Sequence, residues 1–169
     1  MLYLEKVTIL KMNLSKFQRE KCLQLIDKLI SWEICQPFRE LIDPVRDGAP
    51  NYFEVIKEPM SLNEVKKRLM NSQYPDLKTF IHDVNLIWDN ARKYNGDDTI
   101  FAMMAKEAQS YFNRKMNNFP SSVEEDWLMK VRKIANEFHE AITHPPHDID
   151  PKKQREIIAE ATATQTNVV

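Results

Sequence analysis

Residues 35–60 read CQPFRELIDPVRDGAPNYFEVIKEPM, and this stretch decides how the rest of the chain can be arranged. Its prolines and Gly48 follow one another too densely for a long helix or strand. The stretch is also too rich in apolar and aromatic side chains for a disordered linker. Loops longer than about 12 to 15 residues are uncommon in compact domains and usually serve a function. We therefore expect a packed, functional loop.

A helix is expected before this loop. Ser15 and Gln18 stand in the Ser-x-x-Gln pattern of a capping box. Pro37 should end the helix by about residue 35, because the residue before a proline avoids the helical conformation. The expected buried stripe, at helical spacing, is Cys22, Leu25, Ile26, Leu29 and Ile30.

Three more helices are expected after the loop. The first begins at Ser61, the second begins at Asp76, and the third is capped by Asp98 or Thr99. The Asn95-Gly96 pair is a strong hairpin signal, but both of its flanks have helical periodicity. The fold class is therefore expected to be all-α, a four-helix bundle with a long loop between its first two helices.

The composition excludes several classes of protein. With only two glycines, Gly48 and Gly96, no dinucleotide or phosphate-binding glycine loop can be written. The net charge of -1 provides no general attraction to nucleic acid, so no direct nucleic-acid binding is expected. No stretch longer than nine residues lacks Asp, Glu, Lys and Arg, so no membrane span is expected. Two cysteines are too few for a disulfide framework, and we expect a soluble intracellular protein.

Residues 120–144 predict one additional amphipathic helix beyond the bundle. Ser121 and Ser122 open overlapping capping boxes, and an apolar stripe that begins at Trp127 should dock on the bundle or on a partner. Asp150-Pro151 can start one or two further helical turns. The expected organisation is an N-terminal arm (1–14), a bundle (15–119), the additional helix (120–144) and a mobile C-terminal tail (145–169).

The histidines give weak support for catalysis or metal binding. His82 precedes Asp83 within a helix, where adjacent side chains point about 100° apart and should not face each other. His139, His144 and His147 gather near the end of the fifth helix, but two prolines separate them and no cysteine is near. No catalytic residue, metal site or cofactor is therefore expected, and a small helical enzyme is the weakest hypothesis.

The long loop and the Tyr94-Asn95 pair are stronger candidates for a site. Because both loops lie at the same end of the expected bundle, a cleft should form between them. Apolar walls with one amide and two phenols suit a small, neutral, amphipathic group, although simple loop packing is the alternative. The expected lining is Pro37, Phe38, Ile42, Ala49, Tyr52, Tyr94, Asn95 and Phe101.

Two motifs carry a family resemblance. Residues 37–38 (PF) and 49–62 (APNYFEVIKEPMSL) are similar to the loop of bromodomains, with its Pro-Asp-Tyr-Tyr and Ile-x-x-Pro-Met-Asp-Leu sequences. Residues 86–95 (LIWDNARKYN) resemble the same family's approach to its binding asparagine. The resemblance covers about residues 15–117. It implies a left-handed four-helix bundle of bromodomain type and a non-enzymatic acetyl-lysine reader.

By position, the resemblance implies a role for each pocket residue. Asn95 would donate its side-chain amide to the acetyl carbonyl, and Tyr52 would reach the same oxygen through an ordered water. Tyr94 would pack behind the asparagine, and Phe101 would guard the entrance. The shelf would be Pro37 and Phe38, and the loop wall would be Ile42 and Ala49.

The resemblance also implies the partners. The implied partners are acetylated histone peptides or peptides of other acetylated proteins. The implied location is the nucleus, and the implied role is in chromatin and transcription regulation. Membership of a larger complex stays open. Carboxylates outnumber cations around the expected mouth, which suits a basic peptide. Many bromodomains have a tryptophan where this chain has Gln36, so a helical interaction domain whose pocket does not bind acetyl-lysine is the alternative.

Overall fold

The computed structural model describes residues 14–144, 146, 148 and 150–166, which divide into two compact units between Ser121 and Ser122. No strand occurs among these residues. Of the N-terminal arm expected over residues 1–14, all but Leu14 lies outside the described residues.

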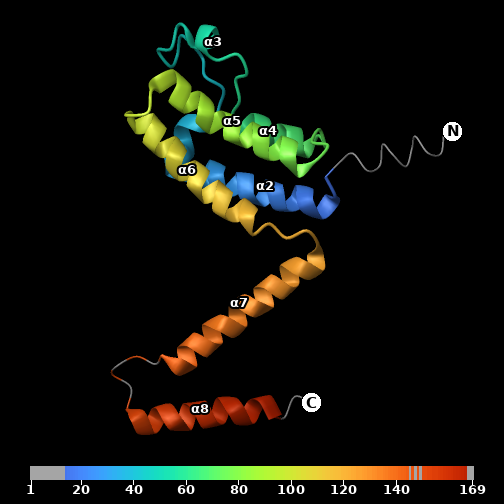
Figure 1. Cartoon of the computed structure of the whole chain (residues 1–169), viewed down its shortest axis with the longest axis vertical. Helices are drawn as coiled ribbons and strands as arrows, with labels where there is room; N and C mark the ends of the chain where they lie inside the picture. The colour runs from blue at the N-terminus through green and yellow to red at the C-terminus, as the bar shows by residue number, and fades with distance from the viewer. Residues whose placement is uncertain (1–13, 145, 147, 149, 167–169) are drawn as a thin grey trace, which may run out of the picture. The chain divides into compact units, whose positions relative to one another are not determined.

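The first unit is a bundle whose helices α2 and α4 pack together, as do α5 and α6 (Figure 1). The loop between α2 and α4 contains two short segments, the 3₁₀ helix η1 (Glu33–Phe38) and α3 (Tyr52–Val55). The all-α bundle with a long first loop is therefore confirmed. The bundle helices are α2 (Lys16–Ser31), α4 (Leu62–Met70), α5 (Leu77–Asn95) and α6 (Ile100–Asn117).

Each bundle helix begins at a polar cap, as predicted. Ser15 and Gln18 form the full reciprocal capping box of α2. Ser61 makes only half of one, since its hydroxyl accepts the backbone N–H three residues on. Asp76 caps α5 and Thr99, one of two candidates, caps α6 in the same way. These caps satisfy N–H groups that have no partner within the first helical turn.

Helix α2 ends at Ser31, earlier than the predicted end near residue 35. Trp32 adopts an extended backbone, and its ring packs against Tyr111 with centroids 5.5 Å apart. The chain then continues as η1, which includes Pro37 and places Phe38 in the core. Tertiary packing of the tryptophan therefore ends the helix before the proline can.

The core lies between the four helices. Trp88, Phe80 and Phe112 are its largest fully buried side chains, and the Phe38 ring meets Trp88 edge-on at 5.3 Å. Both cysteines are free and buried, and burial raises the pKa of Cys22 to about 12. The loop has a small core of its own, so it is packed as expected. This second cluster consists of Ala49, Tyr52 and Ile56.

The second unit contains α7 (Val123–Thr143) and α8 (Pro151–Thr166). Ser122 caps α7 through its hydroxyl, in agreement with one of the two predicted boxes. Helix α8 has 16 residues, which exceeds the one or two turns predicted. Asp150 accepts the N–H of Lys152 at 2.9 Å, and the alanines and charged residues that follow are good helix formers. Residues 145, 147, 149 and 167–169 of the expected tail lie outside the described residues.

Candidate functional site

One pocket brings together all eight site residues predicted from the sequence. It is lined by residues of the long loop, α5 and the first turn of α6, and has a volume of about 510 Å³. The long loop and the α5–α6 connection lie at the same end of the bundle (Figure 1). Small-molecule sites typically have about 300 to 1,000 Å³. The predicted cleft is therefore present. Its lining includes Pro37, Phe38, Ile42, Ala49, Tyr52, Tyr94, Asn95 and Phe101.

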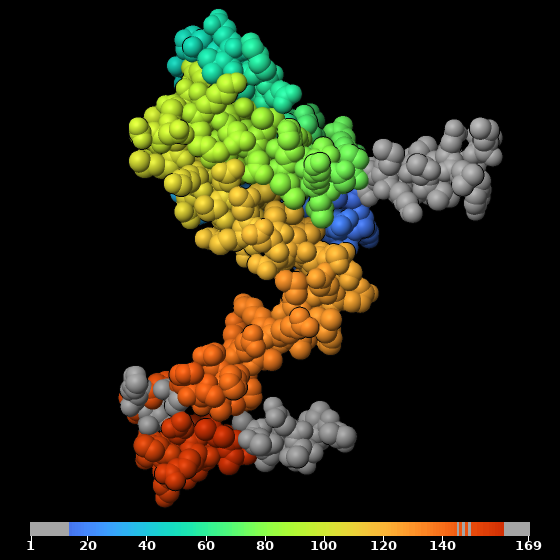
Figure 2. Space-filling view, in the orientation of Figure 1, coloured from blue at the N-terminus to red at the C-terminus, as the bar shows by residue number. Residues whose placement is uncertain are grey.

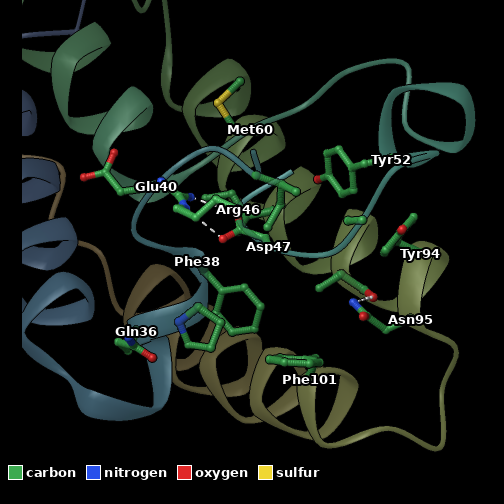
Figure 3. A pocket seen from close by; sticks show the side chains of 15 residues that line it. Gln36, Phe38, Glu40, Arg46, Asp47, Tyr52, Met60, Tyr94, Asn95 and Phe101 are labelled. Atoms are coloured by element: carbon green, nitrogen blue, oxygen red, sulfur yellow. Dashed lines mark hydrogen bonds and ion pairs between the residues drawn. The ribbon is translucent and has the colours of Figure 1, made fainter. Parts of the chain in front are cut away.

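Asn95 is the last residue of α5 and lies at one end of the pocket (Figure 3). Its Nδ2 donates to the carbonyl of Ala91 at 2.8 Å, which fixes the orientation of the carboxamide. A carboxamide nitrogen carries two hydrogens, so one N–H is left for a ligand. The helix ends here because Gly96 has a φ of 85°, a conformation that side-chain-bearing residues rarely adopt.

Two tyrosines form the wall beside Asn95. The rings of Tyr52 and Tyr94 meet with centroids 5.0 Å apart, and the Tyr94 hydroxyl donates to Asn51 Oδ1 at 2.9 Å. The Tyr52 hydroxyl points into the pocket and makes no hydrogen bond within the described part of the chain (Figure 3). Burial raises the pKa of Tyr52, so the hydroxyl stays protonated and can donate to a ligand or water.

Apolar side chains form the other walls. Phe38 is held in place by Trp88, whereas Phe101 on the first turn of α6 is 42% exposed and stands at the mouth (Figure 3). The sequence did not predict that Met60, Ile87 and Ala91 would also line the pocket. Ile87 and Ala91 precede Asn95 by eight and four residues, so they share its helix face. That spacing is the signal in the sequence that points to them, although a core position has the same spacing.

The loop contributes charged groups to the lining. Arg46 Nε and Nη2 contact Asp47 Oδ1 and Oδ2, each at 2.8 Å. This pairing lowers the pKa of Asp47 to about 2. Glu40 also lines the pocket and accepts a hydrogen bond from Asn63 at 2.6 Å. The sequence prediction counted the carboxylates but missed Arg46, which neutralises one of them.

Hydrogen bonds fix the loop on the bundle. Asn90 on α5 is buried and donates its Nδ2 to the carbonyl of Glu58 at 2.8 Å. The backbone N–H of Asn63 donates to the Arg39 carbonyl at 3.0 Å. In the space-filling view, the loop residues in cyan and teal cover the end of the bundle (Figure 2). These contacts hold the pocket wall in position before any ligand binds.

The described residues also test for a membrane span, a metal site and a catalytic histidine. They contain no helix long and apolar enough to cross a membrane, and no group of three or more His, Cys, Asp and Glu that could hold a metal. His147, one candidate ligand, lies outside them. His82 differs from the prediction, because its Nδ1 lies 3.4 Å from Asp83 Oδ1. Asp83 is bound more closely by Arg68, at 2.7 Å.

Comparisons with known proteins agree with this geometry. The family model of the bromodomain matches residues 22–107. The chain belongs to the bromodomain family. Bromodomains are known as acetyl-lysine readers, and the fold is generally non-enzymatic.

Several relatives are chromatin proteins. The SWR1 complex bromodomain subunit bdf1 of Schizosaccharomyces pombe is 30% identical over 129 residues, which are 76% of this chain and 22% of that protein. The nucleosome-remodeling factor subunit NURF301 of Drosophila melanogaster is 38% identical over 104 residues, which are 62% of this chain and 4% of that protein. The chain therefore spans less than a quarter of either relative.

A solved bromodomain structure has the same fold. It is the second bromodomain of Candida albicans Bdf1, bound to an imidazopyridine, with 30% sequence identity and a TM-score of 0.58. The similarity covers 60% of this chain and 99% of that one. The whole of that domain is thus matched by part of this chain.

Proposed function

We propose that the pocket binds the acetylated side chain of a lysine in a histone tail or another acetylated protein. The observation that carries this proposal is that Asn95 keeps one N–H and Tyr52 keeps its hydroxyl for a ligand in the lining of the same pocket. Acetyl-lysine presents one carbonyl oxygen and no charge. Asn95 donates to this oxygen directly, and Tyr52 donates to it through a water.

Discrimination against unmodified lysine follows from desolvation. A buried ammonium loses its hydration and needs a carboxylate in return. Asp47, a carboxylate of the lining, is already paired with Arg46. Glu40, the other carboxylate of the lining, is exposed to solvent and accepts a hydrogen bond from Asn63. The pocket therefore offers poor compensation for a charge, whereas it satisfies a single amide. The shelf of Pro37 and Phe38 supports the aliphatic part of the lysine side chain.

The same proposal extends to the cellular setting. We place the chain in the nucleus, where it binds acetylated chromatin proteins as part of a larger assembly. The names of the relatives support this setting, since one is a subunit of the SWR1 complex and another of a nucleosome-remodeling factor.

Calorimetry with a matched pair of histone peptides, acetylated and unmodified, tests the proposal. The wild-type chain should bind only the acetylated peptide. Asn95→Ala should weaken that binding by about 1 to 3 kcal/mol, because the acetyl oxygen loses its direct donor. The matched control is Asn118→Ala, since Asn118 also donates to a carbonyl four residues earlier, Arg114 at 3.3 Å, but lies outside the pocket.

Two results would contradict the proposal. Equal binding by wild type and Asn95→Ala would remove the asparagine from the site. If neither peptide binds to the folded wild type, the pocket is one that does not read acetyl-lysine. In that case, Gln36→Trp tests whether the missing aromatic wall is the reason.

A further inference from the structure

Helix α7 carries an apolar stripe that is exposed to solvent. Trp127, Val131, Ile134 and Phe138 are 62%, 41%, 65% and 45% exposed. No residue of this helix is buried. Their spacing of four, three and four residues is that of a coiled-coil seam. Contiguous apolar surface of this kind marks an interaction site.

The stripe is complementary to itself. Its two aromatic residues lie at the ends and its two β-branched residues lie inside, arranged symmetrically about the bond between Arg132 and Lys133. When two such helices lie antiparallel, Trp127 of one faces Phe138 of the other, and Val131 faces Ile134. A two-fold interface requires this relation, in which residue i contacts residue j and j contacts i.

Charges beside the stripe select the same arrangement. Lys130 and Glu137 each precede a seam residue, so both lie on one flank of the stripe. In an antiparallel pair, residues of this flank meet each other, which brings Lys130 of each helix to Glu137 of the other. In a parallel pair, Lys130 would instead meet Ala135, which offers no charge. Lys130 is 65% exposed, as is Glu137, so both can reach across.

We propose that α7 pairs antiparallel with α7 of a second copy of this chain. Four apolar layers form its seam, and two Lys130–Glu137 contacts flank it. The pair joins two of the pockets described above, which raises the apparent affinity for a partner that carries two acetylated sites. This last consequence rests on the proposed function, whereas the pairing itself does not.

Sedimentation equilibrium of the full chain over a concentration series tests the pairing. The wild type should pass from monomer to dimer as concentration rises. Ile134→Asp should weaken dimerisation about tenfold or more, because it buries a charge in the seam. Asn136→Asp is the matched control, since it adds the same charge on the opposite face of the helix.

Charge reversal tests the orientation. Lys130→Glu and Glu137→Lys, each alone, should weaken dimerisation about fivefold or more, because two attractive contacts become repulsive. An equimolar mixture of the two variants should dimerise as the wild type does, since the mixed pair has Glu opposite Lys at both contacts. Within α7, Lys130 also contacts Asp126 at 2.8 Å and Glu137 contacts Lys133 at 3.4 Å, but loss of either contact would not be restored by mixing.

Three outcomes would overturn the proposal. If the wild type stays monomeric at every concentration, α7 does not pair with a second copy of the chain. A monomer that Ile134→Asp destabilises shows instead that the same chain covers the stripe. If the mixture of the two charge variants does not restore dimerisation, the dimer is not an antiparallel pair of α7 helices.

Discussion

Two arginine–aspartate pairs in the first unit have nearly the same distance but differ in burial. Arg68 Nη1 lies 2.7 Å from Asp83 Oδ2, and Arg46 Nε lies 2.8 Å from Asp47 Oδ1. The Asp83 side chain is 9% exposed and that of Asp47 is 29% exposed, while the two arginines, Arg68 and Arg46, are 37% and 61% exposed. Removing one partner leaves an unpaired group in the buried case but returns it to water in the exposed case. A distance therefore does not tell how much a pair contributes to stability.

The same contrast distinguishes two tyrosines, Tyr74 of the bundle core and Tyr52 of the pocket. The Tyr74 hydroxyl donates to Asp83 Oδ2 at 2.9 Å, and burial together with this contact raises the pKa of Tyr74. The Tyr52 hydroxyl has no such partner in the described residues. Asp83 and Asn95 are about 18 Å apart along α5, at 1.5 Å per residue. The Tyr74 hydroxyl near Asp83 thus stabilises the fold, whereas the Tyr52 hydroxyl of the pocket is available to a ligand.

The largest expected effect comes from Asp83→Asn. Arg68 loses its opposite charge and Tyr74 loses an ionised acceptor, so the free energy of unfolding should fall by about 2 to 4 kcal/mol. Urea denaturation followed by circular dichroism measures it. Asp47→Asn is the matched control and should change stability far less. Equal losses in both variants would break the contrast between the two pairs.

The second prediction concerns the size limit of the pocket. Phe101 narrows the mouth, so a butyryl group has to displace the ring or ordered water. Such overpacking costs about 1 to 3 kcal/mol, and we expect butyryl-lysine to bind at least about tenfold more weakly than acetyl-lysine, with propionyl-lysine tolerated. Phe101→Ala should reduce this discrimination and also weaken acetyl-lysine binding. Calorimetry with three acylated peptides measures both. Equal affinity of the wild type for acetyl and butyryl would show that Phe101 is not the gate.

The third prediction compares the two tyrosines directly. Tyr52→Phe should weaken acetyl-lysine binding by about 0.5 to 1.5 kcal/mol and leave the free energy of unfolding nearly unchanged, because only a ligand-bound water loses its partner. Tyr74→Phe should do the reverse, since its hydroxyl serves Asp83 alone. Binding and unfolding are measured on both variants. A variant that changes both quantities equally would remove the distinction between the two regions.

The smallest expected effect is a pH dependence of the pocket loop. Pairing with Arg46 lowers the pKa of Asp47 to about 2, below the value of about 3.9 expected in the unfolded chain. The pair therefore contributes to stability above about pH 4, and this contribution is lost as the pH falls toward about 2. Part of the loss of stability in this window should be absent in Asp47→Asn. Thermal unfolding of the wild type and of Asp47→Asn at a series of pH values measures this difference. Identical pH profiles of the two proteins would contradict the prediction.

The sequence predicted most features that depend on neighbouring residues. The four helix caps and the helical stripes are local patterns, and they place the start of each bundle helix correctly. Six of the eight pocket residues lie in the two quoted motifs, whereas Ile42 lies elsewhere in the long loop and Phe101 on the first turn of α6. The loop and the α5–α6 connection both line the pocket.

Features that depend on tertiary contacts were missed. Ile87 and Ala91 have the same apolar spacing whether they face the core or the pocket, so periodicity cannot separate the two roles. Arg46 neutralises Asp47 only through the side-chain conformation that the folded loop imposes. The end of α2 depends on where the Trp32 ring packs. Trp32 and Tyr111 are far apart in the sequence, whereas Arg46 and Asp47 are adjacent and only the folded conformation decides that they pair.

The Asn95-Gly96 bond has a consequence for the chemical ageing of the protein. In such a pair, the glycine nitrogen can attack the asparagine Cγ and expel ammonia, and water then opens the resulting cyclic imide to aspartate or isoaspartate. Folded α5 opposes this reaction, because the Gly96 N–H is held by the Arg92 carbonyl at 2.8 Å and Asn95 is held by Ala91. Unfolding of the helix end removes both restraints. The amide proposed to read the ligand is therefore lost irreversibly at a rate set by how often the last turn of α5 opens.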